Sequence, residues 1–160
     1  MKKIDIIGDN FFGHSSKERV ACRGIVINNN QILLSFETKT GLWMIPGGGI
    51  DIGETEEACC VRELTEETGM IVKPVKQFLV INEFYEEWHF ITNYFICEII
   101  GETRRNLTIG ETRVGMEPRW ILLEEAKNIF SKHQDYTNFD EEKRGLYLRE
   151  YKALECLKMN

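Results

Sequence analysis

Proline is scarce in this sequence, and its three prolines stand singly at Pro46, Pro74 and Pro118. No Pro/Gly/Ser-rich linker, low-complexity tract or internal repeat divides the 160 residues. Hydrophobic residues make up 42% of the chain and charged residues 29%, which is typical of a globular domain. The sequence therefore predicts a single domain over residues 1–160.

Disulfide and zinc-binding patterns are also missing. The cysteines are five in number and none belongs to a CxxC pair: Cys22, Cys59, Cys60, Cys97 and Cys156. An odd set without paired spacing argues against a disulfide framework and a zinc knuckle, and it favours a reducing cytoplasm. No run of residues is apolar over the length that a bilayer requires, so no membrane partner is expected.

Positive charge is in deficit as well. Lys and Arg number 20 against 26 Asp and Glu, which gives a net charge of −6, and no stretch is dense in basic residues. Binding to polynucleotides depends on basic side chains that neutralise phosphates. The composition therefore argues against a nucleic-acid partner, while small phosphorylated ligands remain compatible with it.

Strands and helices are expected to alternate along the chain. A strand is expected in the region 1–19, further strands over 20–28, 31–36, 42–45, 75–82, 89–99 and 118–122, and helices over about 55–68, 124–130 and 140–157. Asn28 to Asn30 should form a tight turn, 83–88 the long tip of a hairpin, and 101–115 a loop. This order predicts layered α and β structure, with the C-terminal helix packed on the rest of the domain.

One acidic segment carries the whole net charge. From Gly48 to Met70 the chain has six Glu and one Asp against one Arg. Glu63, Glu66 and Glu67 stand at i, i+3 and i+4, so their carboxylates share one face of the expected helix. They also fall in its last turn, where the helix dipole already places negative charge. A divalent cation would remove both penalties, and oxygen ligands select Mg²⁺ or Mn²⁺.

An acidic, solvated helix face is the plain alternative, because most charge runs serve solvation. The glycines after Pro46 favour the metal interpretation. Gly47 to Gly49 allow the backbone to approach a ligand closely, although alone they are a weak signal.

Together these residues resemble a known signature. Gly48 is followed after five residues by Glu54, and after seven more by the run Arg62 to Met70 (RELTEETGM). The pattern resembles the Nudix hydrolase signature at every fixed position, and 43–48 and 117–120 also look like that family. The resemblance implies an α+β fold, an α/β/α sandwich with a mixed central sheet. It further implies hydrolysis of a nucleoside diphosphate linked to a group X, by attack of water at phosphorus.

The resemblance also implies a metal site. Glu63, Glu66 and Glu67 would be the ligands of Mg²⁺ or Mn²⁺, with the carbonyl of Gly47 as a further ligand. Bridging cations are physically reasonable here, because an anionic diphosphate would otherwise meet an anionic face.

Catalytic roles by the same resemblance fall on Glu63, Arg62 and Glu66. Arg62 would orient Glu63, or it could form a structural salt bridge to Glu54. Glu63 is the first choice for the general base. Glu111 and Glu117 are outside candidates for a base or metal ligand, and each could equally be a plain surface carboxylate.

The residues that contact the substrate are the least determined part of the site. Gly48, Glu54, Tyr85 and Trp88 are the candidates, since an exposed aromatic ring after the signature could stack on a base. Most rings there would instead be core residues of a half-buried strand.

The proline that tends to mark ADP-ribose hydrolases is absent, which leaves nucleoside triphosphates, nucleotide sugars and other small diphosphates. The rival function is a catalytically silent domain of the same fold that senses nucleotides. Members of the family are often dimers, so the resemblance is also compatible with a homodimer.

Overall fold

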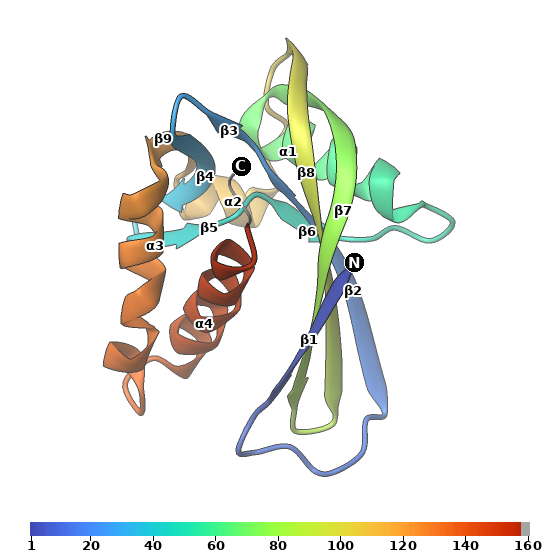
Figure 1. Cartoon of the computed structure of the whole chain (residues 1–160), viewed down its shortest axis with the longest axis vertical. Coiled ribbons are helices and arrows are strands. Elements are labelled where there is room, and N and C mark those ends of the chain that lie inside the picture. The colour runs from blue at the N-terminus through green and yellow to red at the C-terminus, as the bar shows by residue number, and fades with distance from the viewer. Residues whose placement is uncertain (158–160) are drawn as a thin grey trace.

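A computed structural model describes residues 1–157 (Figure 1). The strands are β1 (Lys2–Ile7), β2 (Lys17–Ile25), β3 (Ile27–Asn28), β4 (Gln31–Glu37), β5 (Leu42–Met44), β6 (Gly47–Gly49), β7 (Met70–Tyr85), β8 (Trp88–Glu102) and β9 (Met116–Leu122). The helices are α1 (Glu56–Thr68), α2 (Ile109–Arg113), α3 (Leu123–Ser131), the 3-10 helix η1 (Lys132–Tyr136) and α4 (Glu141–Glu155). The last part of the predicted domain, 158–160, lies outside the described residues.

The strands form two sheets. The first is mixed and has the order β1-β7-β8-β2-β6, in which β1 runs parallel to β7 and β2 parallel to β8. The second is antiparallel, with β4 paired to β3, β5 and β9. The expected α+β class with a mixed sheet is confirmed. The division of the strands between two sheets was not predicted, because it depends on pairings between distant segments.

Two local predictions were wrong. β7 extends to Tyr85 and β8 begins at Trp88, so the hairpin closes through two residues, with Glu86 at φ 49°, rather than through a long tip. Aromatic cross-strand pairs lengthen the strands, as where Phe84 stacks on His89 with ring centroids 4.5 Å apart. The expected loop over 101–115 contains the end of β8 and helix α2, which starts with a capping box between Thr108 and Glu111.

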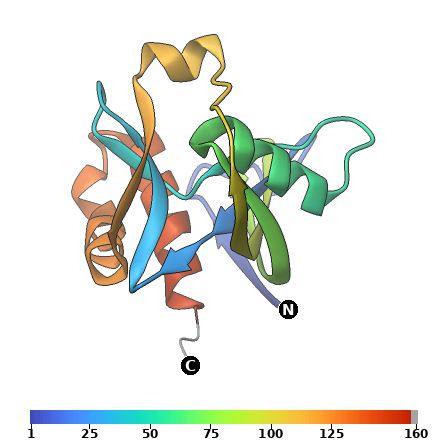
Figure 2. The ribbon, with the colours of Figure 1, turned by 90° about the horizontal axis from the view of Figure 1, so that it is seen from above.

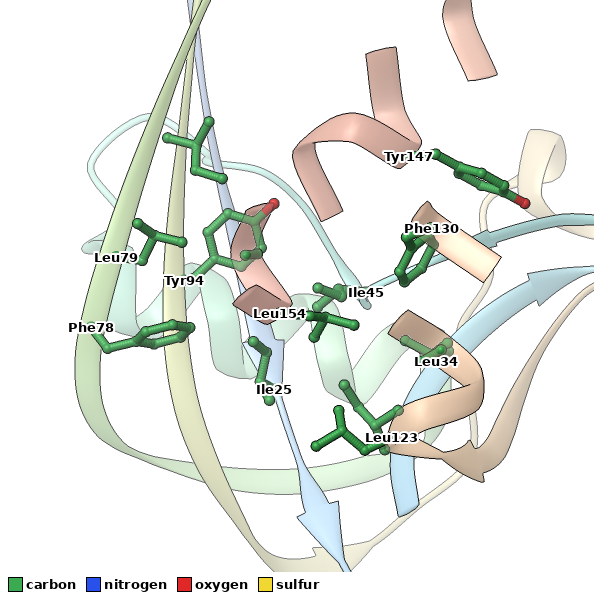
Figure 3. Packing of buried hydrophobic residues seen from close by; sticks show 14 of the residues in the cluster. Ile25, Leu34, Ile45, Phe78, Leu79, Tyr94, Leu123, Phe130, Tyr147 and Leu154 are labelled. Carbon is green, nitrogen blue, oxygen red and sulfur yellow. The ribbon is translucent and has the colours of Figure 1, made fainter. Parts of the chain in front are cut away.

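Two hydrophobic cores hold the layers together. α3 and α4 lie toward one side of the molecule and α1 toward the other, with strands between them (Figure 2). Tyr94, Leu79 and Phe78 of the β7–β8 hairpin face Leu154 of α4 and Ile45 in the first core (Figure 3). The second core lies under α1 and contains four buried free thiols, at Cys22, Cys59, Cys60 and Cys97. Within residues 1–157, no helix combines the length and the hydrophobicity that crossing a bilayer requires.

Candidate active site

Helix α1 has defined ends, and its acidic side chains gather at the second one. The hydroxyl of Thr55 accepts a hydrogen bond from the Ala58 N–H at 3.1 Å, as expected of an N-cap. Gly69 adopts φ 74° and its N–H donates to the Thr65 carbonyl at 3.0 Å. No basic residue lies in the last turn. The last turn of the helix therefore carries negative charge and no basic residue of its own.

Glu63 packs against the backbone of the glycine strand. β6 pairs antiparallel with β2, with Gly48 opposite Cys22. A Cβ at Gly48 would lie 2.5 Å from Glu63 Oε2, so any side chain there would displace the carboxylate. Burial raises the pKa of Glu63, against the opposing effect of Arg62. The absence of a side chain at Gly48 thus lets Glu63 lie against the backbone of β6.

Arg62 connects three carboxylates. Its Nε and Nη2 donate to the two oxygens of Glu54 at 2.7 and 3.0 Å, and its Nη1 donates to Glu63 at 2.9 Å and to Glu66 at 3.3 Å. A further bond joins Nη2 to the Gly49 carbonyl at 3.0 Å. The hydrogen bonds from Arg62 lower the pKa of Glu54 to about 2. Each of the two hypotheses for Arg62 has the contact that it requires, because the guanidinium bridges to Glu54 and also bonds to Glu63.

Glu67 is turned into the protein. It is 1% exposed and accepts hydrogen bonds from Ser35 Oγ at 2.9 Å and from the Gly47 N–H at 3.1 Å. Burial raises its pKa to about 8, although the charge of Arg23 opposes that rise. Ser35 and Arg23 were missed by the sequence reasoning, since a lone serine and a lone arginine in strands carry no signal of a distant carboxylate.

The outside candidates Glu111 and Glu117 have different surroundings. The negative charge of Glu111 contributes to the raised pKa values of Glu63 and Glu67. Glu111 also accepts a hydrogen bond from the Thr108 N–H at 2.9 Å. Glu117 pairs with Arg119 on the surface of β9. Glu111 thus acts electrostatically on two carboxylates of α1, whereas Glu117 has its own partner on β9.

The donor set suits a hard divalent cation. Glu63, Glu66 and Glu67 supply carboxylate oxygens, and Glu66 is the most exposed of the three at 34% of its side chain. Burial and repulsion by neighbouring carboxylates disfavour the charged forms of Glu63 and Glu67, and a bound Mg²⁺ or Mn²⁺ would reverse both effects. Within 1–157, no three His, Cys, Asp or Glu side chains already converge as a metal site, because these carboxylates turn toward Arg62 and Ser35.

The two aromatic candidates for substrate contact, Tyr85 and Trp88, lie in different surroundings. Tyr85 lies on the β1 side of the sheet, where its ring occupies the space that a Cβ at Gly8 would need. It lines a cleft of about 1290 Å³, bounded by β1, β2, β7, η1 and α4 and named here the β1–α4 cleft. Trp88 is not among the residues of that lining; it stacks on Phe90 with centroids 5.3 Å apart, and the Lys17 ammonium lies 5.4 Å from its ring.

Known proteins resemble this chain in sequence and in fold. A family model described as NUDIX domain matches residues 17–142. The chain is 36% identical over 135 residues to an ADP-ribose pyrophosphatase of Methanocaldococcus jannaschii, covering 81% of this chain and 73% of that protein. It is 30% identical over 122 residues to an RNA pyrophosphohydrolase of Histophilus somni, covering 73% of this chain but only 58% of that protein.

Solved structures show the same fold at lower identity. A NUDIX hydrolase from Nitrosomonas europaea superposes with a TM-score of 0.59 at 19% identity, covering 90% of this chain and 98% of that one. The E. coli ORF135 protein gives a TM-score of 0.58 at 18% identity, covering 87% and 91%.

Proposed function

The chain belongs to the NUDIX domain family, and we propose that it is a divalent-metal-dependent pyrophosphohydrolase acting on a nucleoside diphosphate linked to a group X. One observation carries this proposal: Glu63 and Glu67, at the end of one helix, lie against the glycine strand, where burial and like charge raise their pKa values. Divalent cations bound with an anionic substrate would remove that penalty.

Each side chain at the helix end has a role in this proposal. Glu63, Glu66, Glu67 and the Gly47 carbonyl would hold Mg²⁺ or Mn²⁺, which would neutralise charge on the diphosphate and lower the pKa of a bound water. Glu63 accepts the proton of the attacking water as the new bond to phosphorus forms and the phosphorus–oxygen bond to the leaving phosphate breaks. Arg62, anchored by Glu54, keeps the Glu63 carboxylate on Gly48.

The first substrate to test is ADP-ribose, because the Methanocaldococcus relative is named for it. The name of the Histophilus relative, RNA pyrophosphohydrolase, makes 5′-triphosphorylated RNA a comparison substrate. The net charge of −6 argues against RNA, since polynucleotide binding depends on basic side chains. Nucleoside triphosphates and nucleotide sugars complete the set.

Turnover of these compounds with and without Mg²⁺, with products identified by mass, tests the proposal. Glu66→Gln should lower the rate at least about 100-fold, because it removes charge where the metal binds. Glu57→Gln is the matched control, since Glu57 is an exposed residue in the first turn of the same helix. Full activity of Glu66→Gln, or turnover that survives chelation, would contradict the proposal. Binding without turnover by the wild-type protein would indicate the silent nucleotide-sensing domain instead.

A further inference from the structure

The β1–α4 cleft gathers unusual polar groups. Among the described residues, three buried side-chain atoms have no hydrogen-bond partner: Arg23 Nε, Tyr85 Oη and Arg149 Nη2. All three residues line this one cleft, although they come from β2, β7 and α4. Buried polar groups in folded proteins nearly always have partners, and each one left unpaired destabilises the fold. Three in one place indicate a surface arranged for a polar ligand.

An acceptor lies beside these donors. Glu83 also lines the cleft and is 5% exposed, and its nearest basic group is Arg149 Nη1 at 3.7 Å, beyond hydrogen-bond distance. Glu83 and Tyr85 stand at i and i+2 on β7, so both point to the same face of the sheet. The cleft therefore offers a carboxylate acceptor next to guanidinium and phenol donors.

The charges of this region balance. The residues that line the cleft include four arginines and four carboxylates: Arg19, Arg23, Arg144 and Arg149, and Asp9, Glu83, Glu141 and Glu142. A second phosphate would find no net positive charge here. Hydroxyl groups fit better, because each of them can donate to a carboxylate and accept from a guanidinium or a phenol.

The cleft opens beside the proposed catalytic centre. Arg23 lies opposite Gly47 in the β2–β6 pairing and donates to the Ile45 carbonyl at 2.7 Å. Arg19, another lining residue, places its guanidinium next to Gly49. Glu63 lies on one face of the glycine strand, at Gly48, and Arg19 lies on the other face, at Gly49. Because β6 is an edge strand, a substituent of a diphosphate held beside it can pass around this edge to the cleft.

We propose that the β1–α4 cleft binds a hydroxyl-rich sugar as the group X, with Glu83 accepting from its hydroxyls while Arg149 and Tyr85 donate to them. This assignment rests on the proposed function, because the diphosphate at α1 sets which way the substrate lies. It makes Glu83, Tyr85 and Arg149 the residues that select a sugar over a bare phosphate.

Calorimetric binding of ADP-ribose and ADP tests the assignment, since the two ligands differ in the terminal ribose and its phosphate ester. Full-length protein in a Glu66→Gln background with Mg²⁺ removes interference from turnover. Glu83→Gln and Tyr85→Phe, added singly, should each weaken ADP-ribose binding about tenfold and change ADP binding less than about twofold. Glu98→Gln on the exposed end of β8 is the control.

Thermal unfolding separates binding from structural effects. Tyr85→Phe removes a hydroxyl with no partner, so its midpoint should stay equal to that of the parent or rise. Equal weakening of both ligands would place adenosine in the cleft and overturn the assignment, as would no weakening of either. The binding measurement needs no turnover, so the two proposals can fail separately. If the wild type hydrolyses ADP-ribose but the variants show no ribose-specific loss of affinity, only the cleft assignment is overturned. A ribose-specific loss in a protein that hydrolyses nothing would overturn only the proposed catalysis.

Discussion

Three glutamates of one sequence pattern have three different environments. Glu63 rests on Gly48, Glu67 is enclosed by Ser35 and the Gly47 N–H, and Glu66 stays partly exposed beside Arg62. Their acid–base behaviour therefore differs, with the pKa of Glu67 raised to about 8 by burial. Spacing along a helix places carboxylates on one face, but the neighbours across the site determine how each behaves.

Gly48→Ala tests whether the close approach of Glu63 to the backbone matters. The new Cβ would lie 2.5 Å from Glu63 Oε2, so the carboxylate has to move away from the glycine strand. We expect at least a tenfold fall in kcat, because a displacement of about 1 Å at a reacting group can cost that much or more. The measurement is steady-state turnover with Mg²⁺.

Gly49→Ala is the matched control for that change. Its Cβ would meet only the flexible end of Arg19, at 3.4 Å, so little has to move. Equal loss of turnover in both variants would show that the glycine strand, rather than the position of Glu63, is what the substitutions disturb.

The Glu54–Arg62 pair predicts a pH dependence of stability. The folded pKa of Glu54 is about 2, below its ordinary 4.5, so its contribution is complete above pH 4.5 and is lost as pH falls toward 2. Wild type should exceed Glu54→Gln in free energy of unfolding by about 1–2 kcal/mol at pH 7, and the difference should shrink in that acid window. Denaturant unfolding at several pH values measures it. A difference that stays constant from pH 7 to 2 would contradict this explanation.

At the scale of elements, α4 is attached to the strands by a buried polar network. Glu150 is fully buried and accepts from the Ile45 N–H and the Tyr94 hydroxyl at 2.6 Å each, and from Arg149 Nε at 3.0 Å. Burial raises the pKa of Glu150, but Arg149 and Arg23 together hold it below its ordinary value. Helix α4, which forms one side of the β1–α4 cleft, is thus positioned by a charged carboxylate.

Glu150→Gln should destabilise the protein by about 3 kcal/mol, because it leaves buried arginine charge without its partner. Tyr94→Phe, which removes one hydrogen bond to the same carboxylate, should cost only about 1 kcal/mol. Denaturant unfolding of both variants gives the comparison. If Glu150→Gln costs no more than Tyr94→Phe, the ion pair does not hold α4 in place.

For the whole molecule, the excess negative charge and the proposed metal site make stability depend on Mg²⁺. A ligand that binds only the folded state at 100 times its Kd adds about 2.7 kcal/mol. For a domain of this size that raises the midpoint of thermal unfolding by roughly 5–10 °C. Differential scanning calorimetry with MgCl₂ against NaCl at equal ionic strength measures it. An equal rise in NaCl, or an undiminished rise in Glu66→Gln, would show that screening rather than a bound ion is responsible.

The sequence by itself determined the local features of this protein. Backbone preferences within a few residues set the bounds of α1, with its Thr55 cap and Gly69 stop, and the turn at Asn29. The helical repeat likewise places the three glutamates on one face. The mixed α+β class could be predicted for the same reason, since helical and strand periodicities are local. The long reach of β7 and helix α2 were missed, although cross-strand aromatics and a capping box were present in the sequence.

Only the tertiary structure decided which distant residues meet. Glu67 is buried against Ser35 of β4, and Arg23, Glu83 and Arg149 of three different elements line one cleft. These contacts join elements that are far apart in the chain. Such contacts arise from packing of the two sheets and α4 around shared cores, and no single-segment periodicity encodes them. Side-chain burial, and with it each pKa and each unpaired donor, is therefore a property of the fold and not of the spacing of residues.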